Sequence, residues 1–202
     1  MKLFFATSAL ALLAAGAAYA APRNVTGFAS VEARAGMDVE VTVGGAFNVD
    51  VTGRDADRVI TRVSGETLIV EPERGWRGAR NARIRITMPR AEGLSASSGA
   101  DLVATGVSGG AVNLASSSGA DLRVSGTCSS FSADASSGAD LHASDLHCES
   151  GNVSVSSGAD ARVFASGRLD VDASSGGGVV AYGGSDLGNI QLSSGGSFRR
   201  SN

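Results

Sequence analysis

The sequence predicts an all-β protein: a right-handed parallel β-helix of about six coils of 18–20 residues, with a strand-rich N-terminal cap. Two observations predict this fold. A hexapeptide related to SSGADL recurs six times in the second half of the chain, and its glycines follow one another after 20, 19, 20, 18 and 19 residues. On both sides of each copy, apolar and polar residues alternate with a period of two, as in half-buried strands. The repeated glycines are Gly99, Gly119, Gly138, Gly158, Gly176 and Gly195.

Residues 1–20, MKLFFATSALALLAAGAAYA, have the pattern of a secretory signal peptide. Lys2 gives a positive start, an apolar run follows, and Ala18-Tyr19-Ala20 has the small-x-small pattern that precedes a cleavage site. The apolar run is shorter than the roughly 20 residues that a membrane-spanning helix needs. We therefore expect cleavage after Ala20, a periplasmic or secreted cell-surface location, and no transmembrane segment.

Residues 21–90 are expected to form the N-terminal part of the same domain, as a β cap or as the first irregular coils. The stretches MDVEVTV, AFNVDVTG, ETLIVE and ARIRITMP each alternate, and glycine and proline separate them. A solenoid needs such a cap, because an uncovered strand edge pairs with other chains.

Residues 91–202 are expected to form the β-helix. One repeat cannot bury its apolar face alone, but stacked coils can, because each strand then pairs in parallel with its equivalent about 4.8 Å away. The glycine provides the positive φ that a sharp corner requires. The serine before each glycine shares the inward parity of the strands, which predicts a ladder of hydroxyl groups inside the stack. These serines are Ser98, Ser118, Ser137, Ser157, Ser175 and Ser194.

Cys128 and Cys148 occupy equivalent places on consecutive coils, since each lies ten residues before the next motif glycine. Parallel stacking would bring them to about 4.8 Å, within the Cα range of a disulfide, and export permits oxidation. We therefore predict a Cys128–Cys148 disulfide. The alternative is a pair of buried, reduced thiols.

An aspartate follows four of the motif glycines by two residues and has outward parity. These residues are Asp101, Asp121, Asp140 and Asp160. Two positions further along the same face lie Arg123, His142 and Arg162. Together they form the candidate face for binding a ligand or supporting the turns.

Three interpretations of this face are open. Each Asp could accept hydrogen bonds from the corner amides and pair with an arginine, and so support the turn. The row could bind a cation or a glycan, although calcium needs six to eight oxygen ligands. Acids on adjacent coils could cleave a glycan, because carboxylates one coil apart approach the spacing in retaining glycosidases. The repeat argues against this third interpretation, since a catalytic site usually interrupts a repeat, and we assign no catalytic residue.

Charge and composition exclude other classes. Residues 91–202 carry five arginines against eleven acidic residues, so this half lacks the basic face of a nucleic-acid-binding protein. His147-Cys148 with His142 nearby does not match a known metal-ligand spacing. We expect no metal and no cofactor.

The succession of IRITMP and LSASSGADL, with the earlier FASVEARAGMDVEVTVGG, FNVDVTG and GETLIV, resembles the head GIN domain family of auto-transporter adhesins. The resemblance covers residues 25–197. It implies an exported, β-helical, non-enzymatic protein of the cell surface or periplasm. The predicted function is therefore an adhesin-like binding or scaffold protein of the cell envelope, with an envelope glycan or protein as its partner. The alternative is a polysaccharide hydrolase or lyase that uses the acidic outer face.

Overall fold

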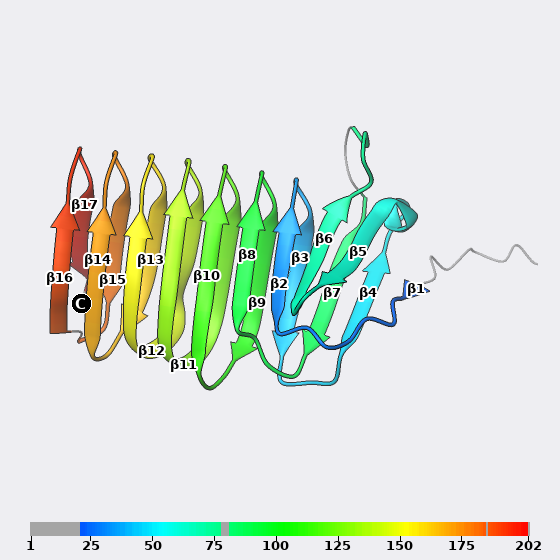
Figure 1. Cartoon of the computed structure of the whole chain (residues 1–202), viewed down its shortest axis with the longest axis horizontal. Coiled ribbons are helices and arrows are strands. Elements are labelled where there is room, and N and C mark those ends of the chain that lie inside the picture. The colour runs from blue at the N-terminus through cyan, green and yellow to red at the C-terminus, as the bar shows by residue number, and fades with distance from the viewer. Residues whose placement is uncertain (1–20, 78–80, 185, 202) are drawn as a thin grey trace, which may run out of the picture.

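The computed structural model describes residues 21–77, 81–184 and 186–201. The chain winds as a right-handed parallel β-helix of about five turns (Figure 1). This is one turn fewer than the six expected. The predicted signal peptide, residues 1–20, lies outside the described residues.

Each turn contributes one strand to each of two facing walls, named here after their last strands. The β16 wall contains β5 (Val59–Ser64), β6 (Thr67–Pro72), β2 (Ser30–Arg34), β8 (Gly93–Ser97), β10 (Ala111–Ser117), β14 (Arg168–Ala173) and β16 (Asp186–Leu192). The β17 wall contains β1 (Ala21–Pro22), β4 (Asn48–Thr52), β7 (Arg83–Met88), β3 (Asp38–Val43), β9 (Asp101–Val107), β13 (Asp160–Ala165), β15 (Gly178–Tyr182) and β17 (Ser197–Ser201). The long strands β11 (Asp121–Ser136) and β12 (Asp140–Val155) cross from the β17 wall to the β16 wall.

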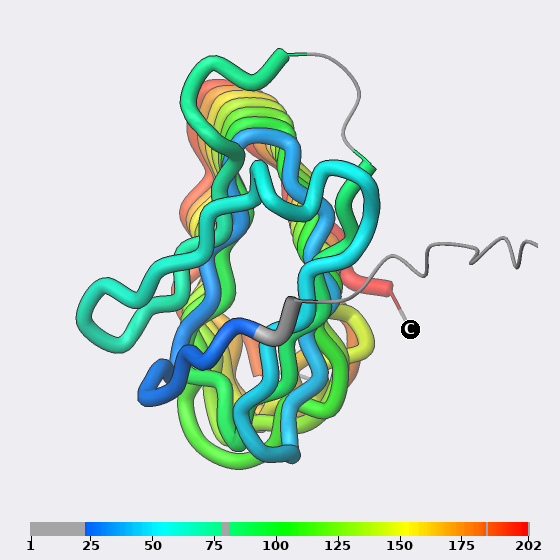
Figure 2. Tube along the Cα trace, turned by 90° about the vertical axis from the view of Figure 1, so that its right-hand side faces the viewer, coloured from blue at the N-terminus to red at the C-terminus, as the bar shows by residue number. Residues whose placement is uncertain are grey.

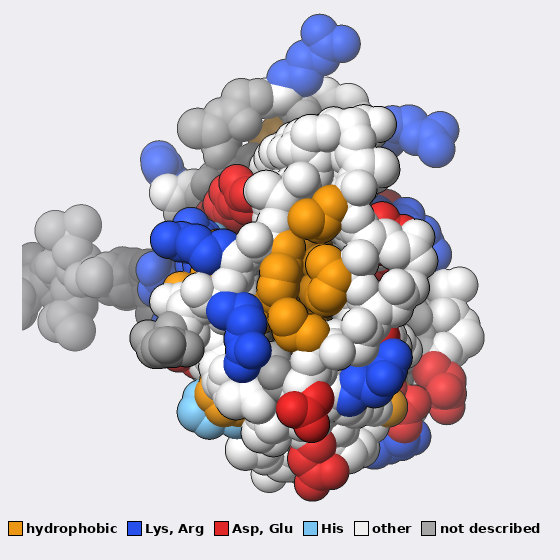
Figure 3. Space-filling model, turned by 90° about the vertical axis from the view of Figure 1, so that its left-hand side faces the viewer, with side chains coloured by type: hydrophobic (Ala, Val, Ile, Leu, Met, Phe, Trp, Pro, Cys, Tyr) orange, Lys and Arg blue, Asp and Glu red, His pale blue; other side chains and the backbone are white. Residues whose placement is uncertain are grey.

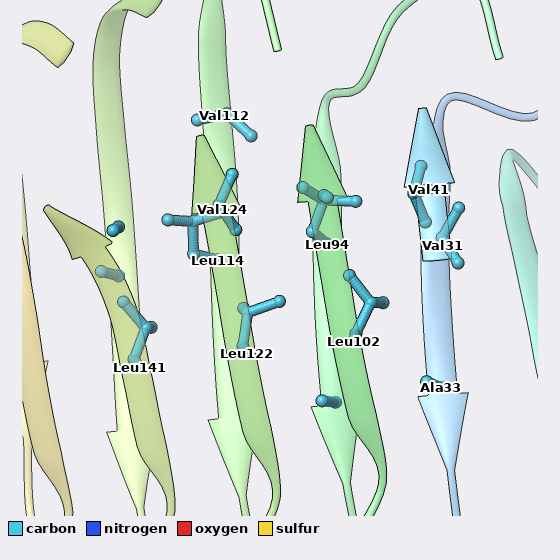
Figure 4. Packing of buried hydrophobic residues seen from close by; sticks show 14 of the residues in the cluster. Val31, Ala33, Val41, Leu94, Leu102, Val112, Leu114, Leu122, Val124 and Leu141 are labelled. Carbon is cyan, nitrogen blue, oxygen red and sulfur yellow. The ribbon is translucent and has the colours of Figure 1, made fainter. Parts of the chain in front are cut away.

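Inward side chains from both walls fill the space between them (Figure 4). Equivalent residues stack from coil to coil, so that Leu102, Leu122 and Leu141 are partners in register, and none of the three is accessible to solvent (0% exposed). Burying one such side chain contributes about 1.5–3 kcal/mol relative to leaving it exposed. The predicted parallel stacking is confirmed, and the core is one continuous column along the helix.

The corners between the walls are two-residue turns in which both residues have positive φ. Ser98 and Gly99 have φ values of 56° and 70°. The Ala100 amide donates to the Ser97 carbonyl at 3.3 Å, as in a type I′ β-turn. The Gly99 amide donates to the Ser118 carbonyl of the next coil at 3.1 Å, so the corners are also linked along the stack.

The predicted inward ladder of serine hydroxyls is wrong, because the six corner serines are exposed. Two consecutive residues with positive φ interrupt the alternation of inward and outward side chains. The residue that points inward after the corner is therefore the alanine that follows the glycine, and Ala100 and Ala120 are 0% and 1% exposed. Backbone hydrogen bonds, not hydroxyl groups, form the ladder along the corners.

Residues 30–43 form a coil in register with the repeat, although they lack its sequence. β2 pairs in parallel with β8, and β3 pairs in parallel with β9. The corner consists of Ala35 and Gly36, with φ values of 52° and 69°. The chain then leaves the stack and returns through β6 and β7, which pair with the outer edges of β2 and β3.

Antiparallel strands close the N-terminal end (Figure 2). β4 pairs with β7, and β5 pairs with β6. The inward side chains of Val49, Val51 and Val59 are 0%, 0% and 1% exposed, so this end of the core is covered.

Cys128 and Cys148 form the predicted disulfide. The two residues are partners in register on β11 and β12, with a Cα–Cα distance of 4.5 Å, and both are buried. The bond joins one coil to the next over a sequence separation of 20 residues.

We expect replacement of both cysteines by alanine to lower the free energy of unfolding by about 3 kcal/mol, because the bond no longer restricts the unfolded chain. Denaturant titration with and without a reducing agent measures the effect. Reduction should destabilise the wild type and leave the double variant unchanged. Equal stability of reduced and oxidised wild type would contradict the expectation.

Candidate functional site

The predicted aspartates lie in one row on the outside of the β17 wall. Parallel register pairs Asp101 with Asp121, Asp121 with Asp140, and Asp140 with Asp160. The row begins one coil earlier than predicted, at Asp38, which is the partner of Asp101. We call Asp38, Asp101, Asp121, Asp140 and Asp160 the aspartate row.

Asp38 is a member of the row that the sequence reasoning does not find. It follows Gly36 by two residues, as in the SSGAD motif. This glycine–aspartate spacing is the signal that could have identified it. The signal is weak because alanine replaces the corner serine and methionine replaces the next alanine, and because a long excursion separates this coil from the repeat.

A second outward row runs beside the first. Arg123, His142 and Arg162 are partners in register on β11, β12 and β13. Glu40 occupies the equivalent position on β3, and its carboxylate pairs with Arg85 at 3.0 Å. The structure thus brings all seven residues of the predicted face together.

The carboxylates of the aspartate row carry charge that the described residues do not neutralise by ion pairs. The ion pairs found among residues 21–77, 81–184 and 186–201 involve other acids. Burial, followed by the charges of Asp121 and Asp38, raises the pKa of Asp101 above its ordinary value. The neighbouring carboxylates of Asp121 and Asp38 therefore make Asp101 harder to ionise.

The backbone of the corners is satisfied without these side chains. The amide of Gly99 donates to a serine carbonyl of the next coil, and the amide of Asp101 donates to the Met37 carbonyl at 3.0 Å. The corner amides that a turn-supporting aspartate would bind thus donate to backbone carbonyl groups instead. The carboxylates are left to face solvent.

His142 is bonded to Arg162 in the second row. The Nη1 atom of Arg162 lies 3.1 Å from Nδ1 of His142. Because a guanidinium only donates, Nδ1 must accept, and the imidazole is neutral with its proton on Nε2. Burial, with the positive charges of Arg162 and Arg123, holds the pKa of His142 below its ordinary value.

Asp121, Asp140 and His142 place possible metal-ligand atoms within 4.8 Å of one another. A cation bound there would have to displace Arg162 from Nδ1 or remove the proton from Nε2. It would also lie near Arg123, the register partner of His142. The hydrogen bond therefore favours Arg162 over a metal ion as the neighbour of His142.

A groove of about 560 Å³ lies at the N-terminal end of the aspartate row. Its volume is within the range of small-molecule sites. Three carboxylates, those of Asp38, Glu40 and Asp101, line it on the β3 and β9 side. The side from the cap contributes Thr52, Asn81 and Arg83. The acidic row therefore continues into a concave surface.

The outer face of the β16 wall also carries polar residues that the sequence reasoning did not assign to a site. They line a shallow groove of about 240 Å³. Asp170 lines this groove and pairs with Arg168 at 2.7 Å, and this hydrogen bond lowers the pKa of Asp170. The acids of this wall provide a control surface for tests of the aspartate row.

The fold resembles solved structures of low sequence identity. A "putative adhesin" from Bacteroides fragilis has a TM-score of 0.71 at 15% identity, over 91% of this chain and 96% of that one. A "putative lipid binding protein" from Parabacteroides distasonis has a TM-score of 0.54 at 14% identity, over 93% and 98% of the two chains. These likenesses concern the fold alone. No curated protein matches the chain.

No helix in the described parts of the chain has the length and apolar character to cross a membrane. A family model described as "Putative auto-transporter adhesin, head GIN domain" matches residues 27–185, which include most of the cap, the aspartate row and the disulfide. The chain belongs to this head GIN domain family.

Proposed function

We propose that the chain is an exported, non-enzymatic, adhesin-like protein of the cell envelope, and that it binds a positively charged surface polymer along the aspartate row. The signal-peptide pattern of residues 1–20 supports export. Membership of an adhesin family supports a binding role. The observation that carries the proposal is the row itself: five carboxylates in register, on consecutive coils, without ion pairs among the described residues.

A row of like charges is costly to hold at the spacing of one coil. Two unit charges about 5 Å apart repel by nearly 1 kcal/mol even in bulk water. The raised pKa of Asp101 reflects burial first and this repulsion second. Because the backbone already satisfies the corners, the row does not stabilise the turns by hydrogen bonding. A positively charged ligand would relieve the repulsion, and a repeating polymer would match the repeating row.

A binding role fits the acids better than glycan cleavage does. The paired catalytic acids of a glycosidase have different environments, so that one is protonated and the other ionised. Here equivalent acids recur from coil to coil as part of the repeat. His142, the nearest potential base, accepts a hydrogen bond from Arg162.

Binding to an immobilised glucosamine polymer and to the same polymer after full N-acetylation tests the ligand-binding part of the proposal. The two polymers share a backbone and differ in positive charge. We expect the exported chain to bind the amine form more strongly than the N-acetylated form, and we expect added salt to weaken this binding. The triple variant Asp101→Asn, Asp121→Asn, Asp140→Asn should lose this preference. The matched control Asp134→Asn, Asp170→Asn, Asp172→Asn changes the net charge equally on the β16 wall and should keep it.

Equal retention of both polymers, or equal loss in the two triple variants, would refute the role of the aspartate row. N-terminal sequencing of the secreted protein separately tests export, with Ala21 as the expected first residue. Retention of full-length protein inside the cell would refute that part. Release of reducing or unsaturated sugar ends from envelope polysaccharide would favour an enzyme instead.

The raised pKa of Asp101 also predicts a pH-dependent stability. The folded state binds the proton more tightly than the unfolded state, so this carboxyl lowers stability as the pH rises through its folded pKa. We expect Asp101→Asn to raise the melting temperature at about pH 7. At about pH 3, where the carboxyl is largely protonated in both states, the difference should vanish. A lower melting temperature at neutral pH would indicate a turn-supporting role.

A further inference from the structure

The two ends of the solenoid differ in how far their inward side chains are exposed to solvent. At the N-terminal end, Val49 and Val51 are fully buried beneath the cap. At the C-terminal end, Leu187 and Leu192 are 42% and 50% exposed. Figure 3 shows the result, an apolar patch at the centre of this end with acidic and basic side chains at its lower margin.

These leucines occupy inward positions. Leu187 is the register partner of Leu169, and Leu192 is the partner of Ala173, both of which are 0% exposed in the preceding coil. Ile190 and Phe198 also continue inward rows and pack against the core from one side only. We call Leu187, Ile190, Leu192 and Phe198 the end face. A further layer of β-structure would bury it.

The strand edges at this end are open as well. Within the described chain, β16 pairs only with β14, and β17 pairs only with β15. Each of these two strands therefore has one row of backbone amides and carbonyls without a neighbouring strand. Such an edge pairs readily with another strand.

We propose that the end face binds the end face of a second copy, so that two chains join through their C-terminal ends into a closed dimer. The two-fold axis of such a dimer is perpendicular to the solenoid axis, and it can run in two directions. An axis perpendicular to the strands places β16 of one copy against β16 of the other with the strand direction reversed. An axis parallel to the strands exchanges the two walls, so that β16 of one copy meets β17 of the other. In both cases the edge strands of the two copies meet antiparallel, which permits backbone pairing. The cap covers the opposite end, so head-to-tail growth into fibres is blocked and the assembly closes at two copies.

Charge at the end face suits a second copy of the same chain. Arg200 lies at an inward position, as the register partner of Ala181, and Asp186 lies at the start of β16. Among the described residues, neither side chain forms an ion pair. When β17 of one copy lies antiparallel to β16 of the other, Arg200 lies near the end of β16 that carries Asp186. Asp186 is the register partner of the exposed Arg168, so its carboxylate would have to reach Arg200 around the strand edge. An inward arginine also disfavours indiscriminate pairing with edges that offer no acid.

The small size of the end face indicates a weak, reversible interface. A seven-residue strand spans roughly 23 Å, and two walls with their side chains span roughly 20 Å, which gives about 450 Å² per copy. About 900 Å² in total is at the low end of specific interfaces. We therefore expect a dimer that dissociates at micromolar concentrations.

Sedimentation equilibrium of the exported chain over a range of micromolar concentrations tests the proposal. The wild type should change from monomer to dimer, and the variant Leu187→Glu, Leu192→Glu should stay monomeric. The matched control is Ile60→Glu, Val63→Glu on β5 of the cap, where the exposed fractions are 39% and 36%. This control should dimerise like the wild type. A monomeric wild type, or a dimer that survives the leucine substitutions, would overturn the proposal.

Distances between spin labels test the dimer in chains that keep both leucines, so this test does not depend on the folding of the leucine variant. Labels at Gln191→Cys on β16 should lie within roughly 20 Å of each other in the dimer, because the labelled strands are then neighbours or one wall apart. Labels at Asp57→Cys in the cap should be roughly 80 Å apart. Close contact between cap labels, with distant Gln191 labels, would contradict association through the end face.

Discussion

Replacing Gly126 with alanine is expected to lower the free energy of unfolding by about 4 kcal/mol, one of the largest effects of any single methyl group in this protein. Gly126 lies on β11 where the register with β9 shifts, and its φ is 137°. A β-carbon there would overlap the carbonyl oxygen and the amide nitrogen of Val107 on the preceding coil. Backbone atoms cannot rotate aside, so the two coils would have to separate locally.

Gly138→Ala is the control for this prediction. Gly138 is a corner glycine with a φ of 68°, and a β-carbon there would meet no atom within 4 Å. Only the strain of the left-handed conformation remains, which costs about 1 kcal/mol. Chemical denaturation of both variants under oxidising conditions measures the difference. Similar losses for the two glycines would show that conformation, and not the close approach of coils, requires Gly126.

Stacking was predictable because the sequence repeats it. A nearly constant interval between corner glycines places Cys128 beside Cys148 and Asp101 beside Asp121, and both pairs are partners in register. Such inferences need only the period and the parallel pairing of equivalent strands. They do not depend on how any one side chain packs.

The inferences that failed depended on local backbone geometry or on contacts distant in sequence. Extending strand parity through the corner places Ser98 inside, but the type I′ turn interrupts that parity. Asp38 was missed because its coil joins the stack only after the chain has formed β4 to β7 and returned. The antiparallel pairing of β4 with β7 could not be predicted from the repeat either, because these strands lie outside it and their pairing depends on tertiary contacts.

The aspartate row and the end face share one origin. Repetition of a coil presents the same outward residue again and again, whether or not the resulting row of charge is favourable. Among the described residues, no strand pairs with the outer edges of β16 and β17, so their inward residues are not covered there. The cap buries Val49 and Val51 at the N-terminal end, whereas Leu187 and Leu192 at the other end remain exposed.

Gly151→Ala is the second substitution with a large expected cost, about 3 kcal/mol, for a reason that lies in packing and not in backbone conformation. Gly151 on β12 is the register partner of Phe131 on β11, and both residues are buried. A β-carbon at Gly151 would overlap the outer atoms of the Phe131 ring. The large side chain on one coil thus occupies the space that the glycine of the next coil leaves free.

A double-mutant cycle separates this packing from a general intolerance of alanine at Gly151. Phe131→Leu alone should cost about 1 kcal/mol, because the smaller side chain still fills most of the site. In that background Gly151→Ala should cost about 2 kcal/mol less than in the wild type, since the leucine can move away from the added methyl group. Denaturant titrations of the wild type, both single variants and the double variant measure this coupling. Additive losses would mean that Phe131 and Gly151 do not share one packing site, and the large-to-small alternation between the coils would no longer explain the glycine.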